Sequence, residues 1–293
     1  MRRRGVLLCA VFGALLAVAV PPDFIQRAPA AAAPTITTLT AIDFPGAIFT
    51  NCWGINNQAL VVGFYQDGAG RYRGFLLAGG RFTTIDVPGS IHTYAFGISD
   101  NGRIVGLYCD DRCHGFLLNG SRFARIDVPG AIYTRANGIN NVGDIVGRYR
   151  DANGKWHGFL LSGGAFSTID VPRALETRAD GINDRGQIVG RYEDAGGQRW
   201  GYIYYTGTFS RVDVPVAGVI ATNARDINNH GEVVGNFRDS VGTVRGFSLS
   251  GARFTPIAFP GAVETYAFGV NEIGQIAGTY LDATGRERGF LGY

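Results

Sequence analysis

Apolar and polar positions follow one pattern that recurs six times between residues 36 and 293. In one clear copy, strand-like runs rich in β-branched and aromatic residues cover 135–140, 144–149, 156–161 and 166–171. The first two segments between these runs place Asn or Asp early and Gly late, as tight hairpin turns require, and the third is Ser162-Gly163-Gly164. Short hairpins join antiparallel neighbours, so each copy predicts a four-stranded antiparallel sheet.

A recurring Gly-Phe or Gly-Tyr pair fixes the period of the pattern. The pairs are 41 to 45 residues apart and begin at Gly74, Gly115, Gly158, Gly201, Gly246 and Gly289. Four strands in about 43 residues are typical of a propeller blade. Consecutive apolar residues within the runs indicate sheets that are covered on both faces. A blade that packs between two other blades needs this pattern. We therefore predict an all-β, six-bladed β-propeller that forms a single domain over residues 36–293.

The ends of the repeat region predict how the ring closes. In most copies the fourth run leads into Asp-Val-Pro, and because Pro cannot donate to a ladder we expect this run to be the outer edge strand. The sequence ends at Tyr293 without such a run, whereas residues 38–45 supply a surplus one. The N-terminal strand should therefore complete the last blade, leaving only short, protected edges.

The residues before the repeats have the pattern of a secretory leader. A basic stretch at 1–4, an apolar run at 6–20 and Ala28-Pro29-Ala30 predict a signal peptide over residues 1–30. An Ala-rich spacer at 31–35 follows. An uncleaved anchor is the alternative, although the run is short for a bilayer. We expect a secreted protein, extracellular or periplasmic, and the Arg pair in the leader leaves the general and twin-arginine routes open.

Cleavage changes the charge. The chain has a formal net charge of +3, and its first 30 residues hold four Arg and one Asp, so the mature chain is neutral. A neutral chain lacks the electrostatic footprint of a nucleic-acid-binding protein. We expect a monomer whose partner is a glycan, a small ligand or an envelope or extracellular protein, with no nucleic acid and no membrane after cleavage.

Two cysteines flank one hairpin turn. Cys109 and Cys113 enclose Asp-Asp-Arg in the second copy, which predicts a disulfide in an oxidising compartment. Metal binding is the alternative, but two thiols beside His114 make an incomplete site. Cys52 occupies a slot that holds Ala in the other copies and should be a core residue. No catalytic or nucleotide-binding motif is present, so we predict no metal and no cofactor.

Two further repeated polar positions predict structural roles. His114 and His157 share a slot that holds Arg in three other copies, which indicates a hydrogen-bonding position. The Asp of Asp-Val/Phe-Pro occurs in five copies, too often around a ring for a catalytic residue, so we expect it to cap turns or backbone.

Positions where the copies disagree are candidates for function. On the predicted innermost strand, the first such slot holds Asn51, Tyr94, Arg135, Arg178, Asn223 and Tyr266. Two residues on, the slot holds Trp53, Phe96, Asn137, Asp180, Arg225 and Phe268. In a closed ring, aromatic residues would gather on one side of the channel and charged residues on the other. Ring stacking combined with fixed hydrogen bonds is a common way to hold a sugar or a small acidic ligand.

We therefore predict ligand binding at the channel or its mouth by ten of these residues: Trp53, Tyr94, Phe96, Arg135, Asn137, Arg178, Asp180, Arg225, Tyr266 and Phe268. The alternative is that these side chains only fill the channel, with Arg and Asp satisfying one another.

The repeats resemble a known family. His157-Gly158-Phe159-Leu160 and His114-Gly115-Phe116-Leu117, with Gly-Ile-Asn and Ile-Val-Gly before them, are similar to the HAF-type repeats of predicted bacterial extracellular proteins. The similarity covers about residues 36–293, with Gly in place of the family's middle Ala and no His in four copies. The resemblance implies secretion and repetition, and it brings no catalytic residues.

Three functional hypotheses follow. We favour a secreted binding or interaction module. A lyase or hydrolase acting on a glycan is the second, with Arg135, Arg178, Asp180 and Arg225 as the clustered candidates, so enzymatic activity stays open. A purely structural surface repeat protein is the third.

Overall fold

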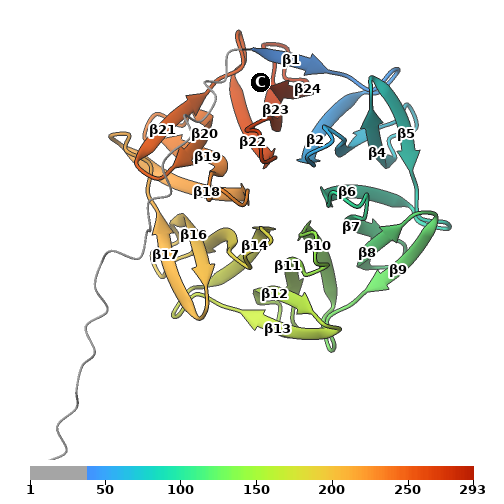
Figure 1. Cartoon of the computed structure of the whole chain (residues 1–293), viewed down its shortest axis with the longest axis horizontal. Helices are drawn as coiled ribbons and strands as arrows, with labels where there is room; N and C mark the ends of the chain where they lie inside the picture. The colour runs from blue at the N-terminus through green and yellow to red at the C-terminus, as the bar shows by residue number, and fades with distance from the viewer. Residues whose placement is uncertain (1–37) are drawn as a thin grey trace, which may run out of the picture. The chain divides into compact units, whose positions relative to one another are not determined.

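A computed structural model describes residues 38–293, and the expected signal peptide and spacer lie outside this range. The described chain forms 24 strands in six four-stranded antiparallel sheets. The sheets are arranged as blades around a central axis (Figure 1). The predicted six-bladed β-propeller is confirmed.

Chain order within a blade runs from the axis outward. The innermost strands are β2 (Phe49–Ile55), β6 (His92–Ile98), β10 (Tyr133–Ile139), β14 (Glu176–Ile182), β18 (Val219–Ile227) and β22 (Glu264–Val270). The second strands are β3 (Val61–Gln66), β7 (Ile104–Cys109), β11 (Ile145–Arg150), β15 (Ile188–Glu193), β19 (Val233–Asp239) and β23 (Ile276–Leu281). The third strands are β4 (Tyr72–Ala78), β8 (Cys113–Asn119), β12 (Trp156–Ser162), β16 (Arg199–Tyr205), β20 (Val244–Ser250) and β24 (Glu287–Gly292). The outer strands are β5 (Arg81–Ile85), β9 (Arg122–Ile126), β13 (Ala165–Ile169), β17 (Thr208–Val212), β21 (Arg253–Ile257) and β1 (Leu39–Ile42).

The N-terminal strand closes the ring as expected. β1 pairs antiparallel with β24, from Leu39 opposite Gly292 to Ile42 opposite Gly289. It thereby becomes the outer strand of the sixth blade (Figure 1). Just after β1, the ring of Phe44 stacks on Tyr65 of the first blade at 3.6 Å between centroids. The closing segment is therefore held by both blades that it joins.

The hydrophobic core lies between the blades rather than inside one of them. Each of six apolar clusters joins neighbouring sheets around the aromatic residue of one Gly-Phe or Gly-Tyr pair. Phe159, for example, is fully buried with Val105 of the preceding blade and Ala136 of its own innermost strand. Apolar residues at consecutive positions thus cover both faces of each sheet, as their pattern predicted.

A glycine in each second strand makes this packing fit. A β-carbon added at Gly147 would lie 2.0 Å from the carbonyl oxygen of Arg135 and 2.7 Å from the ring of Phe159. The same contact occurs at Gly63, Gly106, Gly190, Gly235 and Gly278. Only glycine lets the aromatic ring and the innermost strand approach this closely.

The axis ends on one face in a ring of polar side chains, which we call the asparagine mouth. It consists of the second residue after each innermost strand: Asn57, Asp100, Asn141, Asp184, Asn229 and Glu272. Each backbone N–H donates to a side-chain oxygen of the next member, at 2.7 to 2.9 Å, and the ring closes from Glu272 to Asn57. A cavity of about 70 Å³ lies at this end.

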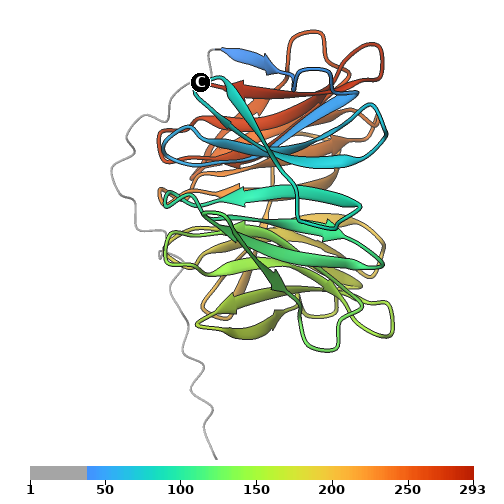
Figure 2. The same cartoon turned by 90° about the vertical axis from the view of Figure 1, so that its right-hand side faces the viewer.

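Figure 2 shows the ring from its side, with hairpin turns at both faces. Within residues 38–293, no helix is long and apolar enough to cross a bilayer.

Candidate binding site at the channel mouth

The second variable slot forms a plug in the channel. In every innermost strand this residue is the bulged one, as between Ala136 and Gly138, and a bulge re-aims a side chain. Trp53 stacks on Phe268 at 4.3 Å and meets Phe96 edge-on at 4.8 Å. The cavity among these residues is about 40 Å³, room for only a few water molecules.

The polar half of the plug is held by hydrogen bonds. Asn137 donates to the carboxylate of Asp180 at 3.1 Å, and Arg225 lies 3.5 Å from the other oxygen of that carboxylate. Asp180 is 8% exposed. An enzymatic role would depend on Asp180 as the acid. Its carboxylate is bound to Asn137 and Arg225 inside the plug.

Arg135 joins the two halves. Its guanidinium lies 3.6 Å from the ring centroid of Phe96 and 4.8 Å from that of Trp53, in cation–π geometry. Its Nε donates to Asn137 at 2.6 Å. Burial and the nearby Arg148 lower the pKa of Arg135 to about 9.

The first variable slot lies nearer the opposite face, where the innermost strands begin. We call this end the arginine mouth, after Arg135, Arg148, Arg178 and Arg191. The six residues of the slot face matching positions on the second strands. These pairs are Asn51 with Phe64, Tyr94 with Leu107, Arg135 with Arg148, Arg178 with Arg191, Asn223 with Asn236, and Tyr266 with Thr279.

An open pocket of about 780 Å³ occupies the aromatic side of this face. We call it the aromatic pocket; it is lined by Phe49, Phe64, Tyr72 and Tyr94, and by Ile48 and the hairpin residues Leu281 and Thr284–Glu287. Tyr72 and Tyr94 lie 5.1 Å apart between centroids. Burial, with a contribution from Tyr72, raises the pKa of Tyr94 to about 12.

Only one residue of this pocket is among the candidates predicted from the sequence. Tyr94 is among the ten candidates, whereas Phe49, Phe64 and Tyr72 come from other positions on the first three strands of the first blade. Phe64 occupies a slot that is Leu, Arg, Arg, Asn and Thr in the other copies. Disagreement among the copies on the second strands was therefore the signal that could have located it.

Asp226 departs from the repeat. The other copies hold Gly at this position, where neighbouring innermost strands come close: a β-carbon at Gly138 would lie 2.9 Å from the carbonyl oxygen of Asp180. The Asp226 carboxylate accepts hydrogen bonds from Ile227 N–H at 2.9 Å and Val270 N–H at 3.0 Å. Burial raises the pKa of Asp226 to about 7, against the lowering effect of these donors and with a further contribution from Glu272.

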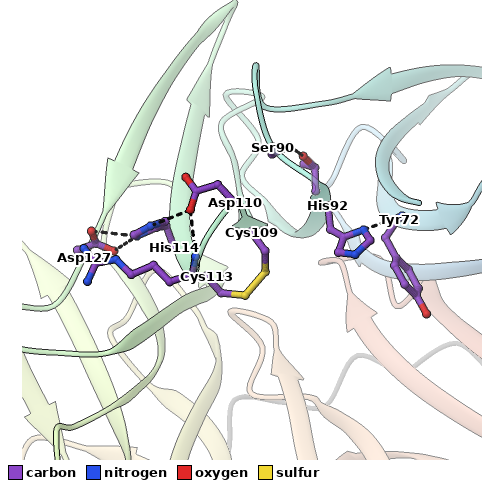
Figure 3. The surroundings of a disulfide bond; sticks show 10 residues. Tyr72, Ser90, His92, Cys109, Asp110, Cys113, His114 and Asp127 are labelled. Carbon is purple, nitrogen blue, oxygen red and sulfur yellow. Dashed lines mark hydrogen bonds and ion pairs between the residues drawn. A yellow bond between two sulfur atoms is a disulfide. The ribbon is translucent and has the colours of Figure 1, made fainter. Parts of the chain in front are cut away.

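The predicted disulfide is present. Cys109 and Cys113 face each other across the β7–β8 hairpin and are bonded (Figure 3). Beside them, His114 is buried between two carboxylates, with Nδ1 at 2.8 Å from Asp127 and Nε2 at 3.5 Å from Asp110 (Figure 3). Cys52 is fully buried, as expected of a core residue, and burial raises the pKa of its thiol well above the usual range.

Removing the disulfide should lower stability moderately. In the chain-entropy account, a loop this short contributes about 2 kcal/mol, or roughly 4–8 °C in melting temperature for a domain of this size. Thermal unfolding of Cys109→Ser/Cys113→Ser should show this shift, and reductant should lower the melting temperature of the native protein only. Cys52→Ala, which introduces the residue of the other copies, is the control. A double variant as stable as the native protein would contradict the expectation.

The repeated Asp pairs with a neighbouring basic side chain instead of capping the backbone. Asp170 lies 2.7 Å from His157 Nδ1, and an arginine takes the place of the histidine in the first and sixth blades. In four copies the backbone N–H that follows this Asp donates to a threonine hydroxyl, as Val171 N–H does to Thr177 at 3.0 Å. The slot shared by His and Arg is thus a hydrogen-bonding position, as expected.

Solved structures of similar fold include lectins. The Aleuria aurantia lectin, described as a six-bladed β-propeller with a novel fucose recognition mode, matches with a TM-score of 0.51 and 12% identity, over 84% of this chain and 93% of that chain. AofleA from Arthrobotrys oligospora matches with a TM-score of 0.54 and 10% identity, over 87% of this chain and 86% of that chain. The SapL1 lectin in complex with α-methyl fucoside matches with a TM-score of 0.55 and 8% identity, over 84% of this chain and 93% of that chain. At these identities the likeness shows the fold.

No protein-family model matches the chain, and no curated protein sequence matches it either. The resemblance to HAF-type repeats therefore stays a prediction that rests on the repeat motif.

Proposed function

We propose that this protein is a lectin-like glycan-binding module that holds its ligand at the arginine mouth. The observation that carries the proposal is the aromatic pocket, about 780 Å³ in volume with four aromatic side chains in its wall. Aromatic faces stack on the apolar faces of sugar rings, and Arg286 and Glu287, which also line the pocket, offer hydrogen bonds to hydroxyl groups. The lectin neighbours support a glycan as the ligand class.

The residues predicted from the sequence divide between two roles in this proposal. Tyr94 lines the aromatic pocket, and Arg178 and Tyr266 occupy the same slot of the innermost strands at the arginine mouth. Six others support it from the plug, since the 40 Å³ cavity among them is too small for a sugar ring: Trp53, Phe96, Asn137, Asp180, Arg225 and Phe268. Arg135 lies between the two sets.

Binding to a glycan array, followed by titration of the best ligand, tests the proposal. Tyr94→Ala should weaken binding about 3- to 10-fold, because one stacked ring contributes about 0.5–1.5 kcal/mol. Tyr205→Ala removes an exposed tyrosine of the third strand β16 and should bind like the native protein. The proposal fails if no glycan binds, or if Tyr94→Ala binds as tightly as the native protein; the former outcome would favour a protein partner or a structural role.

We also propose that the chain is exported, that it belongs with the HAF-type repeats, and that it is a monomer. The leader pattern supports export, and the Cys109–Cys113 disulfide is compatible with an oxidising compartment. The intact mass of the exported chain checks the first point, because removal of residues 1–30 changes it.

A further inference from the structure

The arginines in and below the arginine mouth outnumber the carboxylates that pair with them. Five arginines gather there and in the plug below it: Arg135, Arg148, Arg178, Arg191 and Arg225. Two carboxylates form ion pairs with them: Glu176 lies 3.1 Å from Arg178 and 3.7 Å from Arg191, and Asp180 lies 3.5 Å from Arg225. Within residues 38–293, neither Arg135 nor Arg148 forms an ion pair.

The arginines face one another in pairs. Arg135 lies directly opposite Arg148 in the third blade, and Arg178 directly opposite Arg191 in the fourth. Like charges at directly opposed positions destabilise a sheet. In the other four blades the same pair of positions is uncharged, so the repeat frame does not require these arginines.

The charge is also poorly solvated. The side chains of Arg178 and Arg191 are 18% and 11% exposed, so they reach the mouth with little water around them. The Nε donors of Arg148, Arg178 and Arg191 are buried and have no hydrogen-bond partner among the described residues. Burial and neighbouring arginines lower the pKa of Arg191 to about 9 and that of Arg178 as well.

The ring of Trp156 lies near arginines of both the third and the fourth blade. The guanidinium of Arg148 lies 4.9 Å from its ring centroid, and that of Arg178, from the next blade, lies 5.6 Å from it. Arginines of the third and fourth blades thus lie within cation–π distance of one aromatic ring. Guanidinium groups bind carboxylate and sulfate oxygens through paired N–H donors, and such groups would satisfy the unpartnered ones.

We propose that the opposed pairs Arg135–Arg148 and Arg178–Arg191 bind the anionic group of an acidic saccharide, a carboxylate or a sulfate on a sugar ring. This inference rests on the proposed glycan-binding function and names its ligand class. The aromatic pocket on the other half of the same mouth would take a neighbouring ring of the saccharide. Arg148 and Arg191, which were not among the sequence candidates, become specificity-determining residues.

Titration calorimetry with four probes tests the inference: trigalacturonate, its neutral methyl ester, a sulfated trisaccharide and sodium sulfate. One of the two acidic saccharides should bind at least about 10-fold more tightly than the neutral ester, since a hydrogen bond to a charged group contributes about 1.5–3 kcal/mol. That preference should shrink as salt is raised. Which acidic saccharide binds more tightly distinguishes carboxylate from sulfate.

Arg148→Gln separates loss of binding from loss of fold. It should abolish the preference for the acidic saccharide, yet raise the melting temperature without ligand, because it removes one opposed like charge. Arg122→Gln, which removes an exposed arginine of the outer strand β9, should change neither.

Three outcomes would overturn the inference. Equal binding of the ester and the acids, unchanged in Arg148→Gln, leaves a glycan-binding protein without acidic specificity. Sodium sulfate binding as tightly as the sulfated saccharide indicates a site for the free anion. If none of the saccharides binds and the glycan array is also negative, the proposed function fails with it.

Discussion

Gly147→Ala should cost the protein about 3 kcal/mol or more of unfolding free energy, at or above the upper end of what overpacking usually costs. The added β-carbon would lie 2.0 Å from a carbonyl oxygen of the innermost strand and 2.7 Å from the buried ring of Phe159. Neither neighbour can withdraw, because the first is held in the β10–β11 ladder and the second fills the core between two blades. Thermal or denaturant unfolding measures the loss.

Gly68→Ala is the matched control for this prediction. Gly68 lies at a hairpin turn of the first blade, and nothing lies within 4 Å of an added β-carbon. Its substitution should be neutral or stabilising by up to about 1 kcal/mol, because alanine narrows the unfolded ensemble. Equal effects of the two substitutions would show that the close approach at Gly147 does not limit the fold.

The second large effect concerns pH. The pKa of Asp226 is about 7 in the folded protein, against 3.8 for a free side chain. Between these two pH values the folded state holds a proton that the unfolded chain releases. Stability from this group is therefore complete below about pH 4 and is lost as pH rises through 7. A shift of this size corresponds to about 4 kcal/mol.

Asp226→Asn should remove this part of the pH dependence. The amide oxygen can still accept from Ile227 N–H, but the amide nitrogen would face Val270 N–H, so the variant should lose about 1 kcal/mol at acid pH. The informative quantity is the slope of melting temperature against pH between 4 and 8. Asp213→Asn, at a largely exposed carboxylate, should leave the native slope unchanged. A variant with the native slope would contradict a buried proton at Asp226.

Repetition explains why the fold could be predicted. A hairpin turn seen in one copy is ambiguous, whereas the same turn in six copies defines strand number, order and period. In the third blade, the predicted strands 156–161 and 166–171 were found as Trp156–Ser162 and Ala165–Ile169. The outer strand ends three residues before Pro172, which lies in the link to the next blade.

The site could be predicted only in part, because sequence spacing does not show a bulge. Asn137 and Arg135 are two residues apart, but the bulge at Asn137 sends it into the plug while Arg135 stays nearer the mouth. Arg148 and Arg191 were missed because they lie on the second strands, where only the register brings them opposite the innermost arginines. The asparagine mouth was missed for another reason: its pattern has a period of two copies, not one.

That period constrains how the ring can change in evolution. Carboxamide and carboxylate alternate around the asparagine mouth, and Asn141 donates to both neighbouring carboxylates at 2.8 and 2.9 Å. Adding or deleting one repeat would give an odd ring, which must place two carboxylates or two carboxamides side by side. Two adjacent carboxylates would repel and would lack the amide donor between them. We therefore expect copies to be gained or lost in pairs.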